Sequence, residues 1–207
     1  MPNLTPADES ESLAAELRAH LSATHFSFDG LTGKQATRRI TDAVARWAQA
    51  SGWRAVDEAP VRYIDPPQMR SGGCTTYWEP PWSAYLDLRL FRETGPPIAV
   101  EIDREDFGTA VDKLRDEALR GHPALWIRWH GTLRADVAPG VARLHLPGRS
   151  ARSPVRYSMA PVATAAAITT GGPITPEARA DAALRDRLRA AEEARVTALP
   201  PQPHVVR

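Results

Sequence analysis

Two short segments with alternating side chains, separated by a turn, constrain the fold of this chain more than any other feature. Residues 84–91 and 98–103 alternate apolar and polar positions, with Gly95, Pro96 and Pro97 between them. A period of two places alternate side chains on opposite faces of a β-strand. We therefore expect a hairpin of two half-buried strands. Its apolar positions are Leu86, Leu88, Leu90, Ile98, Val100 and Ile102.

The polar face of this hairpin carries three carboxyl groups. Asp87 lies on the first strand, and Glu101 and Asp103 lie at alternate positions of the second. Pairing of the strands would bring Asp87 alongside the other two. Oxygen ligands gathered in this way suit a hard divalent cation such as Mg²⁺. Cross-strand ion pairs with arginine are the alternative explanation, and it stays open at this point.

Hydrophobic periodicity and turn residues divide the rest of the chain into helices and strands. Helices are expected over 6–21, 34–50 and 105–120, and further strands over 53–63, 124–130 and 141–146. Proline cannot donate to a strand ladder, so the first of these strands is expected to break at Pro60. The pattern predicts an α/β fold with a mixed central sheet of four or five strands flanked by helices.

Composition suggests four units along the chain. Residues 1–30 are expected to form an N-terminal helix and turn, and 31–147 the α/β core. Residues 148–174 are rich in Ala, Pro, Ser, Thr and Gly, which indicates a flexible linker. Residues 175–207 read as a charged helix and tail. Because this helix has few apolar residues, we expect it to be solvated or to dock onto a protein partner.

Charge and cysteine content exclude several classes of protein. The net charge of +1 gives no strongly basic coat. The single cysteine, Cys74, excludes an intramolecular disulfide and a multi-cysteine zinc site. The chain start has no signal-peptide pattern, and no apolar run approaches the roughly 20 residues of a membrane span. A cytoplasmic protein without a membrane partner is expected. Lys34 and Lys113 are the only lysines.

Other motifs carry little functional signal. The six histidines show no metal-ligand spacing, and the stretch from Gly30 to Lys34 lacks the residues of a phosphate-binding loop. Trp78 and Trp82 lie in a long Pro/Gly-rich segment, 65–81 and its flank. They are expected to cover the sheet edge, with stacking on bases as the alternative.

The order helix, strand, strand, strand, helix, strand, with carboxylates on the second and third strands, resembles the PD-(D/E)XK nuclease superfamily. The resemblance covers 34–146 and is nearest to the small single-domain members related to the very-short-patch repair endonucleases. It implies a restriction endonuclease-like fold. The segments that carry it are Leu86-Asp87-Leu88, Ala99-Val100-Glu101-Ile102-Asp103, the helix around 111–119, and Leu125-Trp126-Ile127-Arg128.

What the resemblance implies is an endonuclease, a hydrolase that cleaves DNA with Mg²⁺ or Mn²⁺ as cofactor. Asp87, Glu101 and the backbone carbonyl of Ile102 would hold the metal. A metal in that position lowers the pKa of a bound water and neutralises charge that develops on the phosphate. DNA is then the expected partner. Cutting both strands usually takes two active sites, so a homodimer also stays open.

The chain departs from the family pattern at the usual lysine position, which Asp103 occupies. Some relatives carry the lysine on the following helix, where Lys113 stands. By helical phase Lys113 lies off the apolar stripe that runs from Phe107 to Leu114, which predicts a weak substitute. Arg128, on the neighbouring strand, is a second source of positive charge. The expected catalytic set is Asp87, Glu101, Asp103, Lys113 and Arg128.

The alternative is a catalytically inactive nuclease-fold module that serves DNA binding or protein–protein interaction. The two hypotheses differ in what holds the acids. A nuclease predicts that Asp87 and Glu101 converge with few arginine contacts. A structural module predicts that the acids are engaged by Arg89, Arg104 or Arg128.

Overall fold

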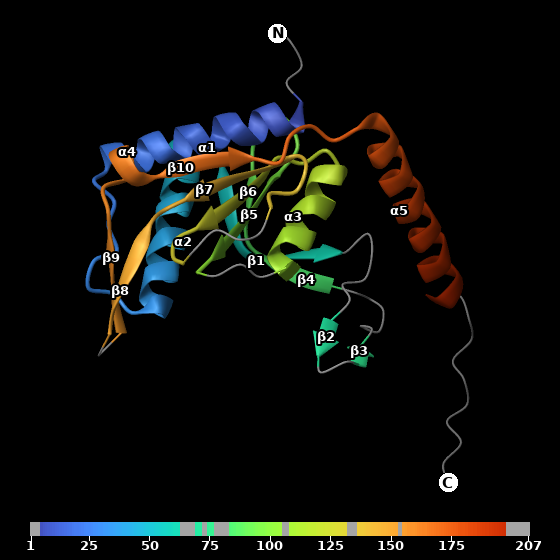
Figure 1. Ribbon diagram of the computed structural model, residues 1–207. Coiled ribbons are helices and arrows are strands. Elements are labelled where there is room, and N and C mark those ends of the chain that lie inside the picture. Colours follow the sequence, from blue (N-terminus) through green and yellow to red (C-terminus); the bar gives the residue numbers. More distant parts are fainter. Residues whose placement is uncertain are drawn as a thin grey trace.

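The computed structural model describes residues 5–62, 69–71, 74–76, 83–104, 108–131, 136–152 and 155–197. Its centre is a mixed six-stranded sheet in the order β1-β4-β5-β6-β7-β10, with helices on both faces (Figure 1). This confirms the α/β class and the mixed sheet flanked by helices. The strands are β1 (Arg54–Arg62), β4 (Ser83–Phe91), β5 (Ile98–Asp103), β6 (Ala124–Arg128), β7 (Val141–His145) and β10 (Ala167–Thr170).

Five helices and two small hairpins complete the described structure. The helices are α1 (Pro6–Ala23), α2 (Gly33–Ala50), α3 (Gly108–Leu119), α4 (Val162–Ala165) and α5 (Pro176–Thr197). Outside the central sheet, β2 (Met69–Ser71) pairs with β3 (Cys74–Thr76), and β8 (Gly148–Arg152) pairs with β9 (Val155–Met159). The order helix, strand, strand, strand, helix, strand is therefore present as α2, β1, β4, β5, α3 and β6, with β2 and β3 inserted after β1.

The hairpin expected from the alternating segments is present. Strands β4 and β5 run antiparallel, with Leu88 opposite Val100, and Gly95 in the turn has φ of +90°, which glycine adopts without strain. After β5 the chain crosses over through α3 to β6, which pairs parallel with β5, and β7 in turn pairs parallel with β6. The carboxyl ends of β5, β6 and β7 therefore meet at one edge of the sheet.

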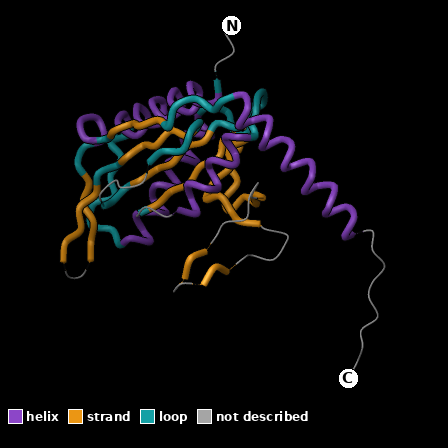
Figure 2. The backbone as a smooth tube through the Cα atoms, turned by 45° about the vertical axis from the view of Figure 1, so that its right-hand side comes forward, coloured by secondary structure: helices purple, strands orange, loops and turns teal. Residues whose placement is uncertain are grey.

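The two faces of the sheet carry separate hydrophobic clusters. Helices α1 and α2 cover one face, where Leu17, Ile40 and Val100 belong to the larger cluster. Helix α3 covers the other face, where Leu114 packs with Trp126. Figure 2 shows α5 extending away from the sheet. The candidate site lies on the α3 face, so α3 is the helix that matters for function.

Local sequence explains where the helices begin and end. The side chains of Thr32 and Gln35 each accept a hydrogen bond from the other's backbone N–H, which forms a capping box at the start of α2. The end of α3 is followed by Gly121 with φ of +87°, the left-handed conformation that terminates helices and favours glycine.

Strand alternation is interrupted where β1 and β4 face each other at Glu58 and Asp87. Leu88 packs under α1 and α2 as expected, but Leu86 packs on the opposite face with Val61, under α3. The prediction of a single inner face for β4 is therefore wrong. Glu58 has φ of +47°, a conformation that side-chain-bearing residues rarely adopt. The irregularity places Asp87 at a break in the strand pattern.

The interpretation of 148–174 as a flexible linker is also wrong. This segment forms β8, β9, α4 and β10, and β10 pairs antiparallel with β7 as the outer strand of the central sheet. Tyr157 and Val162 are buried, and Ile168 packs against the core. These apolar residues stand singly among small polar ones, so the segment shows no periodicity that sequence reasoning could detect.

Strand β1 continues through Pro60, against expectation, because β1 is an edge strand and such a strand tolerates a residue without an N–H donor. Trp78, Trp82 and Phe107 lie outside the described residues. None of the helices in the described part of the chain has the length and apolar content needed to cross a membrane.

Candidate active site

Glu101 lies on the face of β5 that α3 covers. The alternation of β5 is regular: Val100 and Ile102 pack on the α1 and α2 side, whereas Ala99 packs with Leu114 of α3. Glu101 is 3% exposed. A carboxyl group in such a position needs a partner, because burial of an unpaired charge is costly. The sequence prediction that Glu101 faces the same side as the other acids is consistent with this placement.

Asp87 is joined to β5 by its side chain. Its Oδ2 accepts a hydrogen bond of 2.7 Å from the backbone N–H of Ile102. The paired positions of β4 and β5 run from Leu88–Val100 to Leu90–Ile98, so the contact lies just beyond the regular ladder. The Asp87 carboxylate takes up a backbone donor of β5 at that point, and this brings it next to Glu101.

Lys113 of α3 is the ionic partner of Glu101. Its Nζ lies 2.7 Å from Glu101 Oε1 and donates a hydrogen bond of 2.8 Å to the backbone carbonyl of Tyr85 on β4. The position of Lys113 off the apolar stripe predicted a weak substitute for the motif lysine, yet its ammonium group lies beside Glu101. A lysine has a four-carbon stem, so its ammonium group reaches the sheet from the margin of the helix.

Asp103 is held from β6. Trp126 Nε1 donates a hydrogen bond of 2.9 Å to Asp103 Oδ2, and Arg128 stands opposite Asp103 in the parallel register. Arg128 is 1% exposed and donates to the backbone carbonyl of His130. The ring of Trp126 belongs to the hydrophobic cluster under α3. The parallel register, which sets Trp126 beside Glu101, is the signal that could have shown the contact.

Burial raises the pKa of all three carboxyl groups, and the charge of Asp87 adds to the rise at Glu101 and Asp103. Burial raises the pKa of Glu101 to about 8, against the attraction of Lys113 and with a further rise from Asp87 and Asp103. Burial likewise raises the pKa of Asp103 to about 6, although Trp126 donates to it and Arg128 attracts it. The pKa of Asp87 is also above its usual value because of burial, against the Ile102 hydrogen bond. A site of this kind gains from an added cation.

The described contacts of the arginines and the acids show how this part of the sheet is held together. Arg89 pairs with Glu117 at 2.9 Å, and Glu101 pairs with Lys113. Arg128 does lower the pKa of Asp103 by its charge. Arg104 lies 3.5 Å from the hydroxyl of Tyr157. The acids nearest the break in β4 are therefore held by a backbone N–H and a lysine.

A second polar cluster, which sequence reasoning missed, lies farther along α3. Glu117 is one helical turn from Lys113 and is 3% exposed. It contacts Arg89 and His122. The available signal was the spacing of Lys113 and Glu117 at i and i+4, which places both on one side of a helix. On that side of α3, the positive Lys113 thus meets the acidic Glu101 of β5, and the negative Glu117 meets the basic Arg89 of β4.

Among the residues that the structure describes, no three His, Cys, Asp or Glu side chains are grouped so that they could hold a metal ion. The acidic cluster therefore offers fewer than three such ligands in this arrangement. No protein-family model, curated protein or solved structure matches the chain.

Proposed function

We propose that this chain is a divalent-metal-dependent endonuclease of the PD-(D/E)XK type that hydrolyses phosphodiester bonds in DNA. The observation that carries the proposal is the meeting of Asp87, Glu101 and Lys113 on one face of the sheet. The order α2, β1, β4, β5, α3, β6 supports it, because this is the order that the family resemblance implies. Lys113 supports it further, as a lysine supplied by the following helix.

The donor set fits Mg²⁺ or Mn²⁺. Asp87, Glu101 and the backbone carbonyl of Ile102 are oxygen donors, which hard divalent cations prefer. The raised pKa values of Asp87 and Glu101 mean that a nearby cation would be favourable electrostatically. The metal, when bound, lowers the pKa of a water and neutralises charge on the phosphate.

The remaining residues supply charge and position. The ammonium group of Lys113 has three N–H donors. Two of them are directed to the Glu101 carboxylate and to the Tyr85 carbonyl, which leaves the third for a ligand. It is placed to bind a phosphate oxygen as negative charge develops. Trp126 orients Asp103 through its indole N–H. Arg128 adds positive charge from β6 and takes part of the role that the motif lysine has in the family.

Cleavage assays on the full chain test this proposal. We expect the protein to cut plasmid or single-stranded DNA with Mg²⁺ or Mn²⁺ and to be inactive with EDTA. Asp87→Asn should lower the rate at least about a hundredfold, because it removes a metal ligand. Asp112→Asn is the matched control, since Asp112 pairs with Arg115 on α3 and should leave the rate unchanged. Equal rates for wild type and Asp87→Asn would contradict the assignment.

One observation favours the alternative, a non-catalytic DNA-binding or protein-interaction module. The ion pair between Lys113 and Glu101 satisfies the most buried acid of the site without a metal. That module would bind DNA or protein and cut nothing under any metal condition. Binding of DNA by a chain that shows no cleavage with either metal would favour it over the nuclease.

Metal binding is expected to strengthen as pH rises. The pKa values of about 6 for Asp103 and about 8 for Glu101 mean that protons compete with the metal below pH 8. One displaced proton makes the apparent affinity rise about tenfold per pH unit between pH 6 and 8. Quenching of tryptophan fluorescence by Mn²⁺ measures the apparent affinity at each pH. The difference between wild type and Trp126→Phe gives the part of the quenching that arises at Trp126, beside Asp103. Quenching that is independent of pH would be inconsistent with ligation by Glu101.

A further inference from the structure

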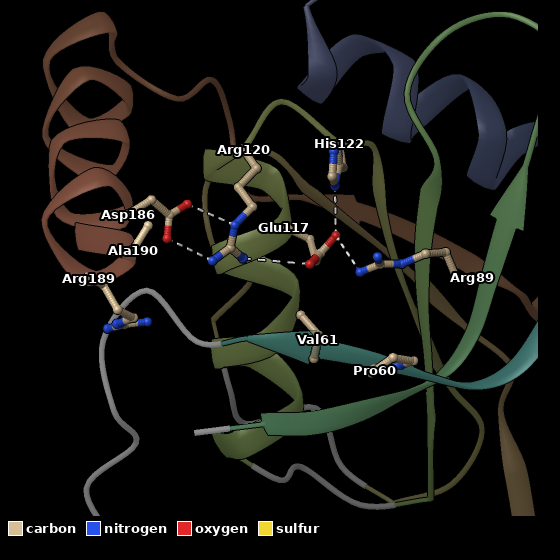
Figure 3. A pocket seen from close by; sticks show the side chains of 9 residues that line it. All are labelled: Pro60, Val61, Arg89, Glu117, Arg120, His122, Asp186, Arg189 and Ala190. Atoms are coloured by element: carbon tan, nitrogen blue, oxygen red, sulfur yellow. Dashed lines mark hydrogen bonds and ion pairs between the residues drawn. The ribbon is translucent and has the colours of Figure 1, made fainter. Parts of the chain in front are cut away.

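A polar pocket of about 380 Å³ lies between α3, α5 and the strands β1 and β4 (Figure 3). Residues of β1, β4, α3 and α5 line it, together with the turn after α3. The lining contains three arginines and two acids, so it carries a net positive charge when histidine is neutral. The polar lining residues are Arg89, Glu117, Arg120, His122, Asp186 and Arg189.

Glu117 neutralises part of this charge within the pocket wall. Its carboxylate lies 2.9 Å from Arg89, 2.7 Å from His122 Nδ1 and 3.6 Å from Arg120. Burial alone would raise the pKa of Glu117, but the His122 hydrogen bond and the two arginine charges outweigh it and lower the pKa. The Glu117 side chain is therefore ionised and engaged on three sides.

Arg120 points to a different partner across the pocket. Its Nε and Nη2 donate hydrogen bonds of 3.0 and 3.1 Å to the two carboxylate oxygens of Asp186 on α5. This two-pronged contact is also the way in which a guanidinium binds a phosphate group. The two side chains are 20% and 34% exposed, so water reaches the contact.

Helix α5 is well suited to give up this contact. Most of its described residues are exposed, and Ala182 is its buried apolar residue. Arg189, two turns along the chain from Ala182, also lines the pocket. An incoming anion could replace the Asp186 carboxylate on Arg120 while α5 stays in place and keeps Arg189 near the anion.

Two elements of the candidate active site, β4 and α3, also line the pocket. Arg89 is two residues from Asp87 on β4, and Glu117 is one turn from Lys113 on α3. Arg120 is seven residues beyond Lys113, which is about 10 Å along a helix at 1.5 Å per residue. Successive phosphates on one strand are separated by roughly twice the 3.4 Å axial rise of a duplex, so this distance corresponds to one or two nucleotides. A phosphate in the pocket would therefore belong to the same backbone as the one at Glu101.

We propose that this pocket binds a backbone phosphate of the nucleic acid, one or two nucleotides from the phosphate that is cleaved, and that Arg120 exchanges Asp186 for it. Asp186 then occupies the phosphate position in the free protein and competes with the substrate. This inference rests on the proposed function for its substrate. The recognised chemistry is a phosphate group, which inorganic phosphate also carries.

Fluorescence anisotropy with labelled DNA in EDTA, where no cutting occurs, tests the exchange in the full chain. Asp186→Asn should tighten binding about fivefold, because it removes the competing carboxylate. Arg120→Gln should weaken binding about tenfold and lower the slope of log affinity against log salt by about one. Arg38→Gln is the matched control. Arg38 pairs with Asp42 and Asp57, outside the pocket, and should change neither quantity.

The opposite signs of the two effects distinguish phosphate binding from a structural ion pair. A structural pair predicts that both variants weaken binding or that neither changes it, and either result overturns the proposal. Thermal melting of both variants is the control that tests whether they are folded. If inorganic phosphate raises the melting temperature of wild type but not of Arg120→Gln while DNA affinity is unchanged, the pocket takes free phosphate and the DNA assignment is overturned. The experiment measures DNA binding and not DNA cleavage, so its result is independent of the nuclease proposal.

Discussion

Glu101→Gln is expected to make the protein more stable at alkaline pH. The folded-state pKa of Glu101 is raised from 4.5 to about 8, so the folded chain binds a proton more tightly than the unfolded chain between these values. Stability therefore falls as pH rises from about 4.5 to 8 and stays reduced above it. Glutamine resembles the protonated acid and removes this loss. We expect a gain on the order of 3 kcal/mol at pH 9, or roughly 5–10 °C in Tm.

Glu117→Gln provides the matched comparison, because Glu117 is the other buried glutamate of the α3 face. Its pKa is lowered, so its charged form stabilises the fold. Loss of that charge removes the carboxylate that pairs with Arg89 and should cost about 3 kcal/mol. Thermal melts of both variants in EDTA at pH 5 and pH 9 measure the two effects. If Glu101→Gln is less stable than wild type at pH 9, the ion pair with Lys113 more than offsets the cost of burying the wild-type Glu101 carboxylate.

Lys113→Met is expected to lower the rate of DNA cleavage at least about a hundredfold. The ammonium group is the positive charge nearest to Glu101, and removal of one preorganised donor to developing charge costs this much in other enzymes. Without the lysine the pKa of Glu101 should rise further, since Lys113 now opposes the effect of burial. The pH dependence of the residual rate should therefore shift to higher pH.

Lys34→Met is the control for that experiment, because the chain has one other lysine and it is exposed at the start of α2. It should leave both the rate and its pH dependence unchanged. Lys113→Arg keeps the charge and should recover part of the rate. A Lys113→Met variant with the wild-type rate would show that Arg128 alone supplies the charge, and Lys113 would then be structural.

The parts of the site that follow from local patterns could be predicted. A period of two placed Glu101 and Asp103 on one face, and the Gly95 turn placed Asp87 on the adjacent strand. The crossover helix and the strand at 124–128 followed from helical periodicity and from an apolar run. These features depend on neighbours in the sequence, so the sequence alone is enough to establish them.

The features that depend on distant contacts could not be predicted. The reach of Lys113 to Glu101 depends on the distance between α3 and the sheet, which helical phase does not give. Leu86 changes face opposite the irregular backbone of Glu58, which has φ of +47°. A positive φ is usually signalled by glycine in the sequence, and no glycine stands at this position. The contact between Arg120 and Asp186 joins residues 66 positions apart. Tertiary packing sets all three.

The segment 148–174 shows how composition can mislead. Small and polar residues suggested a linker, but β10 completes the sheet because β7 offers it an edge. A strand that gains its stability from a neighbour needs few apolar residues of its own. The four or five strands expected from the sequence therefore became six.

The decisive test of the nuclease proposal is cleavage of DNA by wild type and by Glu101→Gln, side by side with Mn²⁺ at pH 8.5. Because the variant is expected to be at least as stable as wild type at this pH, loss of activity cannot be ascribed to unfolding. The nuclease proposal predicts that wild type cuts and that Glu101→Gln is slower by at least about a thousandfold, which is about 4 kcal/mol of transition-state stabilisation. Equal cutting by both proteins, or none by wild type on duplex and single-stranded DNA, would contradict it.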